Sequence, residues 1–164
     1  MSDASNLDID VQDKFERGWG KVERGFFVLF VIFILSGLAG LLGDGPLGRQ
    51  HVAFAGTSVR VTYDRFLRDR GQTDLVVEVD QPIASDTLWL GFDRNFLARN
   101  KISSSTPTAA FAQTSASGVQ YGFRLGPDHR GRVIIALEPQ GMGLAHGAIS
   151  YGAAHLTLNQ IVYP

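Results

Sequence analysis

The run Phe26-Phe27-Val28-Leu29-Phe30-Val31-Ile32-Phe33-Ile34-Leu35 is apolar at every position, and no charged residue occurs from residue 26 to residue 43. A helix of about 18 to 20 apolar residues matches the roughly 30 Å hydrocarbon core of a bilayer, whereas a buried helix of a small soluble protein normally keeps a polar stripe. The stretch 26–43 therefore predicts a single transmembrane helix. Since the chain has 164 residues, the remainder can form only one small domain.

A cleaved secretory signal is the alternative interpretation of the apolar run. The sequence Ala53-Phe54-Ala55 has the small residues of a cleavage site, but it lies about ten residues beyond the run, which is longer than the usual apolar region of a signal peptide. A lipoprotein anchor is excluded, because the chain has no cysteine to acylate. We therefore expect the helix to be retained as a membrane anchor.

Positive charge is distributed unequally around the apolar run, and this predicts its orientation. The basic residues before the run are Lys14, Arg17, Lys21 and Arg24. After it, Arg49 is the only one within about fifteen residues. Because basic flanks stay in the cytoplasm, the tail 1–25 should be cytoplasmic and the C-terminal domain extracytoplasmic. In a bacterium this means the inner membrane, with the domain in the periplasm.

The N-terminal tail carries apolar residues at helical spacing, namely Val11, Phe15, Trp19 and Val22. It predicts either an amphipathic helix on the membrane or a partner, or an interfacial anchor for the membrane helix. The residues expected to form the anchor are Phe15, Trp19, Lys21 and Arg24. Gly18 and Gly20 weaken a continuous helix and favour a break before the membrane.

The second half of the predicted span is rich in small residues. Those expected to face another helix are Ser36, Ala39, Gly40 and Gly43. Small side chains let helix backbones approach closely, which favours association in lipid. The span contains no His, Asp, Glu, Lys or Arg, so it is not expected to carry out chemistry within the membrane.

Apolar and polar residues alternate after the predicted linker, 44–57, as in Val59, Val61 and Tyr63. A period of two is typical of half-buried strands. The pattern recurs in 75–79, 88–92, 119–125, 133–137 and 156–163. About seven to nine such strands with few helices predict a mainly β domain over 58–164, an antiparallel β-sandwich, with a small barrel as the alternative. The stretch 103–118, rich in Ser, Thr and Ala, reads as a long loop or an irregular edge.

No motif in the sequence points to catalysis. The histidines are scattered and lack metal-ligand spacing: His51, His129, His146 and His155. The chain has no Gly-x-Ser-x-Gly elbow, dinucleotide fingerprint or phosphate loop. We therefore expect a protein that is not an enzyme and that has no catalytic residues, cofactor or metal.

Charge gives one further candidate site. The whole chain has 15 basic and 16 acidic residues, which argues against nucleic acid as a partner. Basic residues concentrate early in the exported domain, at Arg60, Arg65, Arg68 and Arg70. They are candidates for contact with lipid headgroups or with acidic loops of a partner, or else form a solvated face with internal ion pairs.

Four motifs together resemble a group of small uncharacterised bacterial single-pass membrane proteins. They are the cytoplasmic box from Phe15 to Arg24, the helix ending in Leu42-Gly43-Asp44-Gly45-Pro46-Leu47, the strand Tyr63-Asp64-Arg65-Phe66 and the terminal Gln160-Ile161-Val162-Tyr163-Pro164. The resemblance implies architecture only, a membrane anchor followed by an extracytoplasmic β-domain. Gly18 and Gly20 depart from the bulky residues beside the tryptophan in that group, which questions a rigid cytoplasmic helix.

Two functions fit these features. The first is a non-catalytic accessory subunit whose helix packs against subunits of a larger integral-membrane complex and whose β-domain caps that complex, aiding its assembly or stability. A respiratory or photosynthetic complex is a candidate host. The second is a membrane-tethered module that binds a soluble ligand or an envelope component, with Tyr151 and Phe111 as the nearest candidate aromatic contacts.

Overall fold

The computed structural model describes residues 7–38 and 48–164 and, in the first range, side chains from residue 20 onward. Helix α1 (Leu7–Leu38) runs without interruption through Gly18 and Gly20, so the predicted break is wrong. Each glycine costs a helix only about 1 kcal/mol relative to alanine, which the other thirty positions offset. The anchor residues Lys21 and Arg24 lie on this helix and are exposed, whereas the side chains of Phe15 and Trp19 fall outside the described part.

Within residues 7–38 and 48–164, no helical segment combines the length and the apolar character that a membrane crossing requires. The predicted span, 26–43, continues five residues beyond Leu38. Ala39, Gly40 and Gly43, which were predicted to contact another helix, thus lie outside the described residues.

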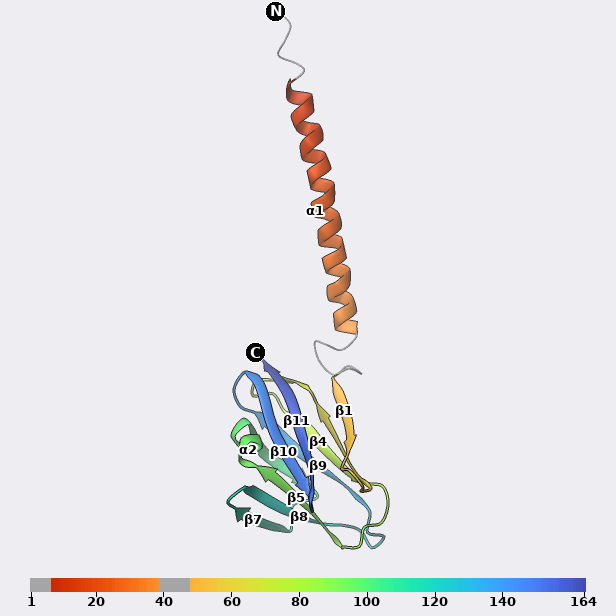
Figure 1. Cartoon of the computed structure of the whole chain (residues 1–164), viewed down its shortest axis with the longest axis vertical. Helices are drawn as coiled ribbons and strands as arrows, with labels where there is room; N and C mark the ends of the chain where they lie inside the picture. The colour runs from red at the N-terminus through yellow and green to blue at the C-terminus, as the bar shows by residue number, and fades with distance from the viewer. Residues whose placement is uncertain (1–6, 39–47) are drawn as a thin grey trace, which may run out of the picture.

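The rest of the described chain is a two-sheet β-domain (Figure 1). The first sheet has the order β1-β2-β4-β9-β6, with β1 (Arg49–Ala53), β2 (Val59–Asp64), β4 (Thr73–Val79), β9 (Gly131–Pro139) and β6 (Asn100–Thr106). The second has the order β3-β11-β10-β5-β8-β7, with β3 (Phe66–Arg68), β11 (Ala154–Tyr163), β10 (Gly143–Tyr151), β5 (Thr87–Asp93), β8 (Gly118–Arg124) and β7 (Phe111–Ser115). Among the described strands, only β3 and β11 pair in parallel.

The prediction of a mainly β domain is confirmed, and the two sheets do not close on each other, so the alternative of a barrel is wrong. The domain begins at Arg49 and not at residue 58, because β1 occupies part of the predicted linker. Within the predicted loop 103–118, strand β7 pairs with β8 at the edge of the second sheet. Strand β10, with its two glycines and little alternation, was not predicted.

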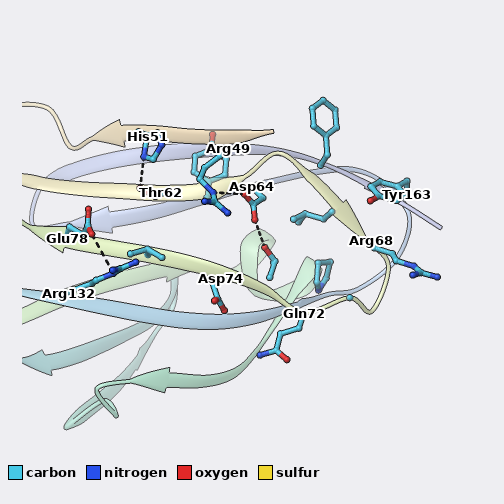
Figure 2. Close-up of a pocket in the computed structure, with 17 residues that line it drawn as sticks. Arg49, His51, Thr62, Asp64, Arg68, Gln72, Asp74, Glu78, Arg132 and Tyr163 are labelled. Atoms are coloured by element: carbon cyan, nitrogen blue, oxygen red, sulfur yellow. Dashed lines mark hydrogen bonds and ion pairs between the residues drawn. The ribbon is translucent and has the colours of Figure 1, made fainter. Parts of the chain in front are cut away.

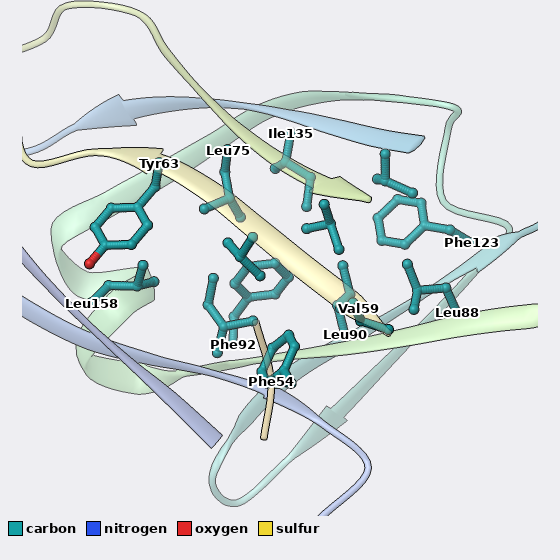
Figure 3. Close-up of a cluster of buried hydrophobic side chains, with 14 of the residues drawn as sticks. Phe54, Val59, Tyr63, Leu75, Leu88, Leu90, Phe92, Phe123, Ile135 and Leu158 are labelled. Atoms are coloured by element: carbon teal, nitrogen blue, oxygen red, sulfur yellow. The ribbon is translucent and has the colours of Figure 1, made fainter. Parts of the chain in front are cut away.

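The main hydrophobic core lies between the sheets (Figure 3), and a second, small cluster joins Leu67, Ala145 and Val162. Val59, Val61 and Tyr63 of β2 point into it, as their alternation predicts. From the other sheet, Phe92 is 1% exposed and its ring lies 5.2 Å from that of Phe96. The described domain therefore buries a complete core without any contribution from α1.

The short helix α2 (Arg94–Arg99) follows β5 and was not predicted; it packs on β10. The Asp93 carboxylate holds it in place. Asp93 Oδ1 accepts a hydrogen bond from the backbone N–H of Phe96 at 2.7 Å, which caps the helix, and one from the N–H of Ala148 on β10 at 3.0 Å. One carboxylate oxygen thus ties the helix start to the neighbouring strand.

Replacing Asp93 by alanine should lower the free energy of unfolding by roughly 2 to 3 kcal/mol, because the cap is lost and the N–H of Ala148 loses its acceptor. Asp93→Asn keeps an oxygen at Oδ1 and should cost less than about 1 kcal/mol. Urea unfolding of the full chain in detergent, followed by tryptophan fluorescence, measures both. If Asp93→Ala and Asp93→Asn lower the free energy of unfolding equally, the two hydrogen bonds that Oδ1 accepts are not the reason why Asp93 stabilises the domain.

Candidate functional site

A chain of backbone hydrogen bonds joins the point where the chain enters the domain to the end of its last strand. The carbonyl of Gly48 accepts from Arg65 N at 2.7 Å, and the carbonyl of Arg65 accepts from Ile161 N at 2.7 Å. The N–H of Asp69 donates to the carbonyl of Tyr163, also at 2.7 Å. We call this end of the domain, with the start of β1, the β2–β3 junction and the end of β11, the linker end (Figure 1).

A cleft of about 700 Å³ opens at the linker end and extends over the outer face of the first sheet (Figure 2). Its polar side chains bond mainly to one another. Arg49 Nε lies 3.4 Å from Asp64 Oδ1, and Arg132 Nε lies 3.5 Å from Glu78 Oε1. His51 Nδ1 shares a hydrogen bond with the Thr62 hydroxyl at 2.9 Å.

Because these charges are paired across neighbouring strands, the cleft is nearly balanced in charge. The lining also includes Arg68, Gln72 and Asp74, which Figure 2 labels and which take part in none of these pairs. Such a surface can hold a polar or zwitterionic group by hydrogen bonds. It offers no cluster of like charges for a strongly charged small molecule.

The described residues contain no group of three or more His, Asp or Glu side chains placed to hold a metal ion. Three histidines have polar partners of their own. His51 bonds to Thr62, His129 Nδ1 lies 3.0 Å from the carbonyl oxygen of Ile83, and His146 Nδ1 lies 2.7 Å from Asn159 Oδ1. The structure thus places these histidines in separate local hydrogen bonds.

The predicted arginine cluster divides in two. Arg60 lies away from the linker end, where its guanidinium pairs with Asp80 at 2.9 Å. Arg65 lies at the β2–β3 junction, Arg68 ends β3, and Arg70 lies in the turn that follows. Arg70 has a positive φ of 56°, which is uncommon for a residue other than glycine, and its Nε lies 3.9 Å from Asp69 Oδ2.

An apolar patch beside these arginines was missed from the sequence. It consists of the exposed Met142, Leu144, Ile161 and Tyr163 and the half-buried Phe66, which we call the apolar patch. Register places Phe66 beside Ile161 and Ile161 beside Leu144, so one row crosses three strands on the outer face of the second sheet. Leu144 is 63% exposed and Met142 60%.

A sequence signal for this patch existed. Ile161-Val162-Tyr163 is apolar at three successive positions, and consecutive apolar residues in a strand must place some of them on the outer face. Val162 is indeed buried, at 3% exposed, while its two neighbours point outward. The contribution of Leu144 and Phe66 depends on strand pairing, which the local sequence does not contain.

The other predicted contact residues are used within the fold. The Ser36 hydroxyl donates to the carbonyl of Phe33 at 2.7 Å, so its polar group is satisfied within α1. Tyr151 packs against Phe54 with ring centroids 5.9 Å apart. Phe111 stacks on Trp89 at 5.8 Å, and the two candidate aromatic contacts therefore lie in different places.

Comparison with known proteins finds no matching family model, no matching curated protein and no matching solved structure. The resemblance to small bacterial single-pass proteins therefore stays a prediction from the motifs quoted above.

Proposed function

We propose that this protein is a single-pass membrane protein that serves as a non-catalytic accessory subunit of a larger integral-membrane complex. In this proposal residues 26–43 cross the bacterial inner membrane with the N-terminus in the cytoplasm. The β-domain covers the periplasmic face of the complex and aids its assembly or stability.

One observation carries the membrane part of the proposal. Between Phe26 and Leu38, every large apolar side chain except Val31 has an exposed fraction between 44% and 74%. These side chains point in all directions around α1, so covering one face would leave the others in water. Since burying each large apolar side chain is worth about 1.5 to 3 kcal/mol, a solvent of lipid fits this surface better than water.

The β-domain supports the accessory role because its polar groups bond mainly within the domain. Its core is complete, and most charged residues of the cleft at the linker end pair with one another, Arg49 with Asp64 and Arg132 with Glu78. Such a domain is suited to be a stable cap. The small residues that follow Ser36 in the sequence, Ala39, Gly40 and Gly43, supply the surface by which a neighbouring helix could pack closely.

The cleft of about 700 Å³ favours a second candidate, a membrane-tethered module that binds a polar ligand or an envelope component. The two candidates differ in their partners. An accessory subunit has integral-membrane subunits as partners, whereas a tethered module has a soluble or envelope-derived one.

Affinity purification of the full chain in mild detergent, followed by mass spectrometry, tests the proposal. We expect integral-membrane subunits in stoichiometric amounts. Gly40→Ile should reduce their recovery several-fold by adding bulk on the small-residue face, whereas the control Val31→Ile should not. Recovery of the protein alone, from both the unmodified chain and the control, would contradict the accessory role and favour the tethered module.

A further inference from the structure

We infer that the linker end of the β-domain docks on the surface of a bilayer containing anionic lipids. In this docking the apolar patch inserts at the headgroup level, and Arg65, Arg68 and Arg70 contact lipid phosphates. This inference rests on the proposed function, since the helix must first place the domain at a membrane. It adds a fixed orientation of the domain and a lipid class as the ligand.

The position of exposed apolar residues is the first argument. Outside α1, the large hydrophobic side chains exposed by 36% or more in the described domain are Phe111, Met142, Leu144, Ile161 and Tyr163. All except Phe111 lie at the linker end, beside the point where Gly48 enters the domain. An exposed apolar patch on a stable domain marks an interaction surface, and this one faces the side from which the membrane helix comes.

Charge is the second argument. Arg65 and Arg68 are exposed and have no ion-pair partner among the described residues. Two of the acidic residues nearby are engaged in the fold: Asp64 pairs with Arg49, and Asp69 Oδ1 accepts the N–H of Gly141 at 2.9 Å. A third, Asp74, is exposed and lines the cleft together with Arg68. Because Arg65 and Arg68 outnumber it, the linker end keeps an excess of positive charge, which attracts anionic headgroups.

The two kinds of residue lie side by side. Register pairs Arg68 with Tyr163 and Phe66 with Ile161, so Arg68 lies directly beside an aromatic residue of the apolar patch. Figure 2 shows Arg68 and Tyr163 at the same extremity of the domain. Aromatic residues with arginines next to them are typical of the membrane interface, where one part of the side chain is apolar and the other is hydrated.

Chain length is the third argument, and it selects lipid as the occupant. If the span ends at Gly43, the five residues from 44 to 48 reach at most about 18 Å. A headgroup layer is about 5 to 8 Å thick, so the linker end cannot move far from it. A bilayer is therefore always within reach of this surface, whereas a soluble partner has to arrive there by diffusion.

Fluorescence quenching in vesicles tests the inference, and the absence of cysteine makes single labels simple. The full chain is reconstituted alone in vesicles of phosphatidylcholine, with or without phosphatidylglycerol. A label is attached to L144C at the linker end, to A153C about 25 Å away at the other end of the β10–β11 hairpin, or to F30C in α1. Nitroxides on lipid headgroups or acyl chains serve as quenchers.

We expect headgroup nitroxides to quench the label at position 144, and more strongly when phosphatidylglycerol is present, while the label at position 153 stays unquenched. Arg65→Gln with Arg68→Gln should lower the ratio of docked to undocked domains roughly fivefold per arginine in the anionic vesicles. Both arginines are exposed, so the double variant is expected to fold.

The label at position 30 separates the two proposals. If acyl-chain nitroxides quench it while positions 144 and 153 respond alike, the anchor stands and the docking is overturned. If position 30 is not quenched, the membrane anchor itself fails and the docking fails with it. If quenching at position 144 is the same with and without phosphatidylglycerol, and the same in the double arginine variant, the role of anionic lipid in the docking is overturned.

Discussion

Replacing Ile34 and Leu35 by arginine is expected to remove the protein from the membrane. Both side chains lie at the middle of the proposed span 26–43 and are exposed, at 44% and 58%, so an arginine there would not disturb packing within the chain. Each arginine near the centre of a span costs about 2.5 to 3.5 kcal/mol on insertion scales, so two cost roughly 5 to 7 kcal/mol. Insertion should therefore fall by more than about a thousandfold.

The measurement is the fraction of protein that floats with membranes and resists extraction at alkaline pH. Val22→Arg with Glu23→Arg is the matched control, because it places two arginines on the same helix outside the apolar run, beside Lys21 and Arg24. The control should stay in the membrane. A double variant at positions 34 and 35 that still floats with the membranes would mean that α1 is held by protein contacts and not by lipid.

Much of the β-domain could be predicted because its strands are amphipathic. In β2 the alternation of Val59, Val61 and Tyr63 with polar residues matches the burial of every second position. Strand β4 behaves in the same way. A half-buried strand in a two-sheet domain has one face in the core and one in water, so its sequence has to carry the period of two.

The missed elements are those whose stability comes from other parts of the fold. Strand β10 has glycine at position 147 because α2 lies against it, and this small residue hides the alternation. Strand β7 is exposed at all five positions, so it has no core face to reveal. Helix α2 has only six residues and depends on the Asp93 cap and on packing against β10, not on helical periodicity.

The candidate site was predicted only in its charges. Arg65, Arg68 and Arg70 are neighbours in sequence, so their proximity could be read directly, although Arg60 proved to lie apart. The apolar patch is assembled from β3, the β9–β10 turn, β10 and β11, and its first and last residues, Phe66 and Tyr163, are 97 positions apart in the sequence. Its existence depends on register, which long-range strand pairing determines.

The second large effect on stability is expected from substitutions at Gly147, which lies against α2. A Cβ at Gly147 would lie 2.6 Å from Phe96 Cβ and 2.7 Å from Phe96 Cα. Because one of these atoms is backbone, a change of rotamer at Phe96 cannot relieve the clash, and α2 would have to move away from β10. That movement would pull Phe96, which is 1% exposed, out of its contact with Phe92.

Gly147→Ala should therefore lower the free energy of unfolding by about 1 to 3 kcal/mol, and Gly147→Val by more, since overpacking costs this much per site and the valine adds two further carbons.

Ala148→Val is the matched control, because the next residue of β10 is only half-buried and points to the opposite face. It should change stability by less than about 0.5 kcal/mol. Urea unfolding of the full chain in detergent gives all three values. Equal stability of Gly147→Val and the control would mean that α2 is not packed against β10 in solution. Because position 144 lies about 10 Å from Gly147 along β10 and on the opposite face of the strand, headgroup quenching of a label at position 144 should survive Gly147→Ala under conditions in which the domain is still folded.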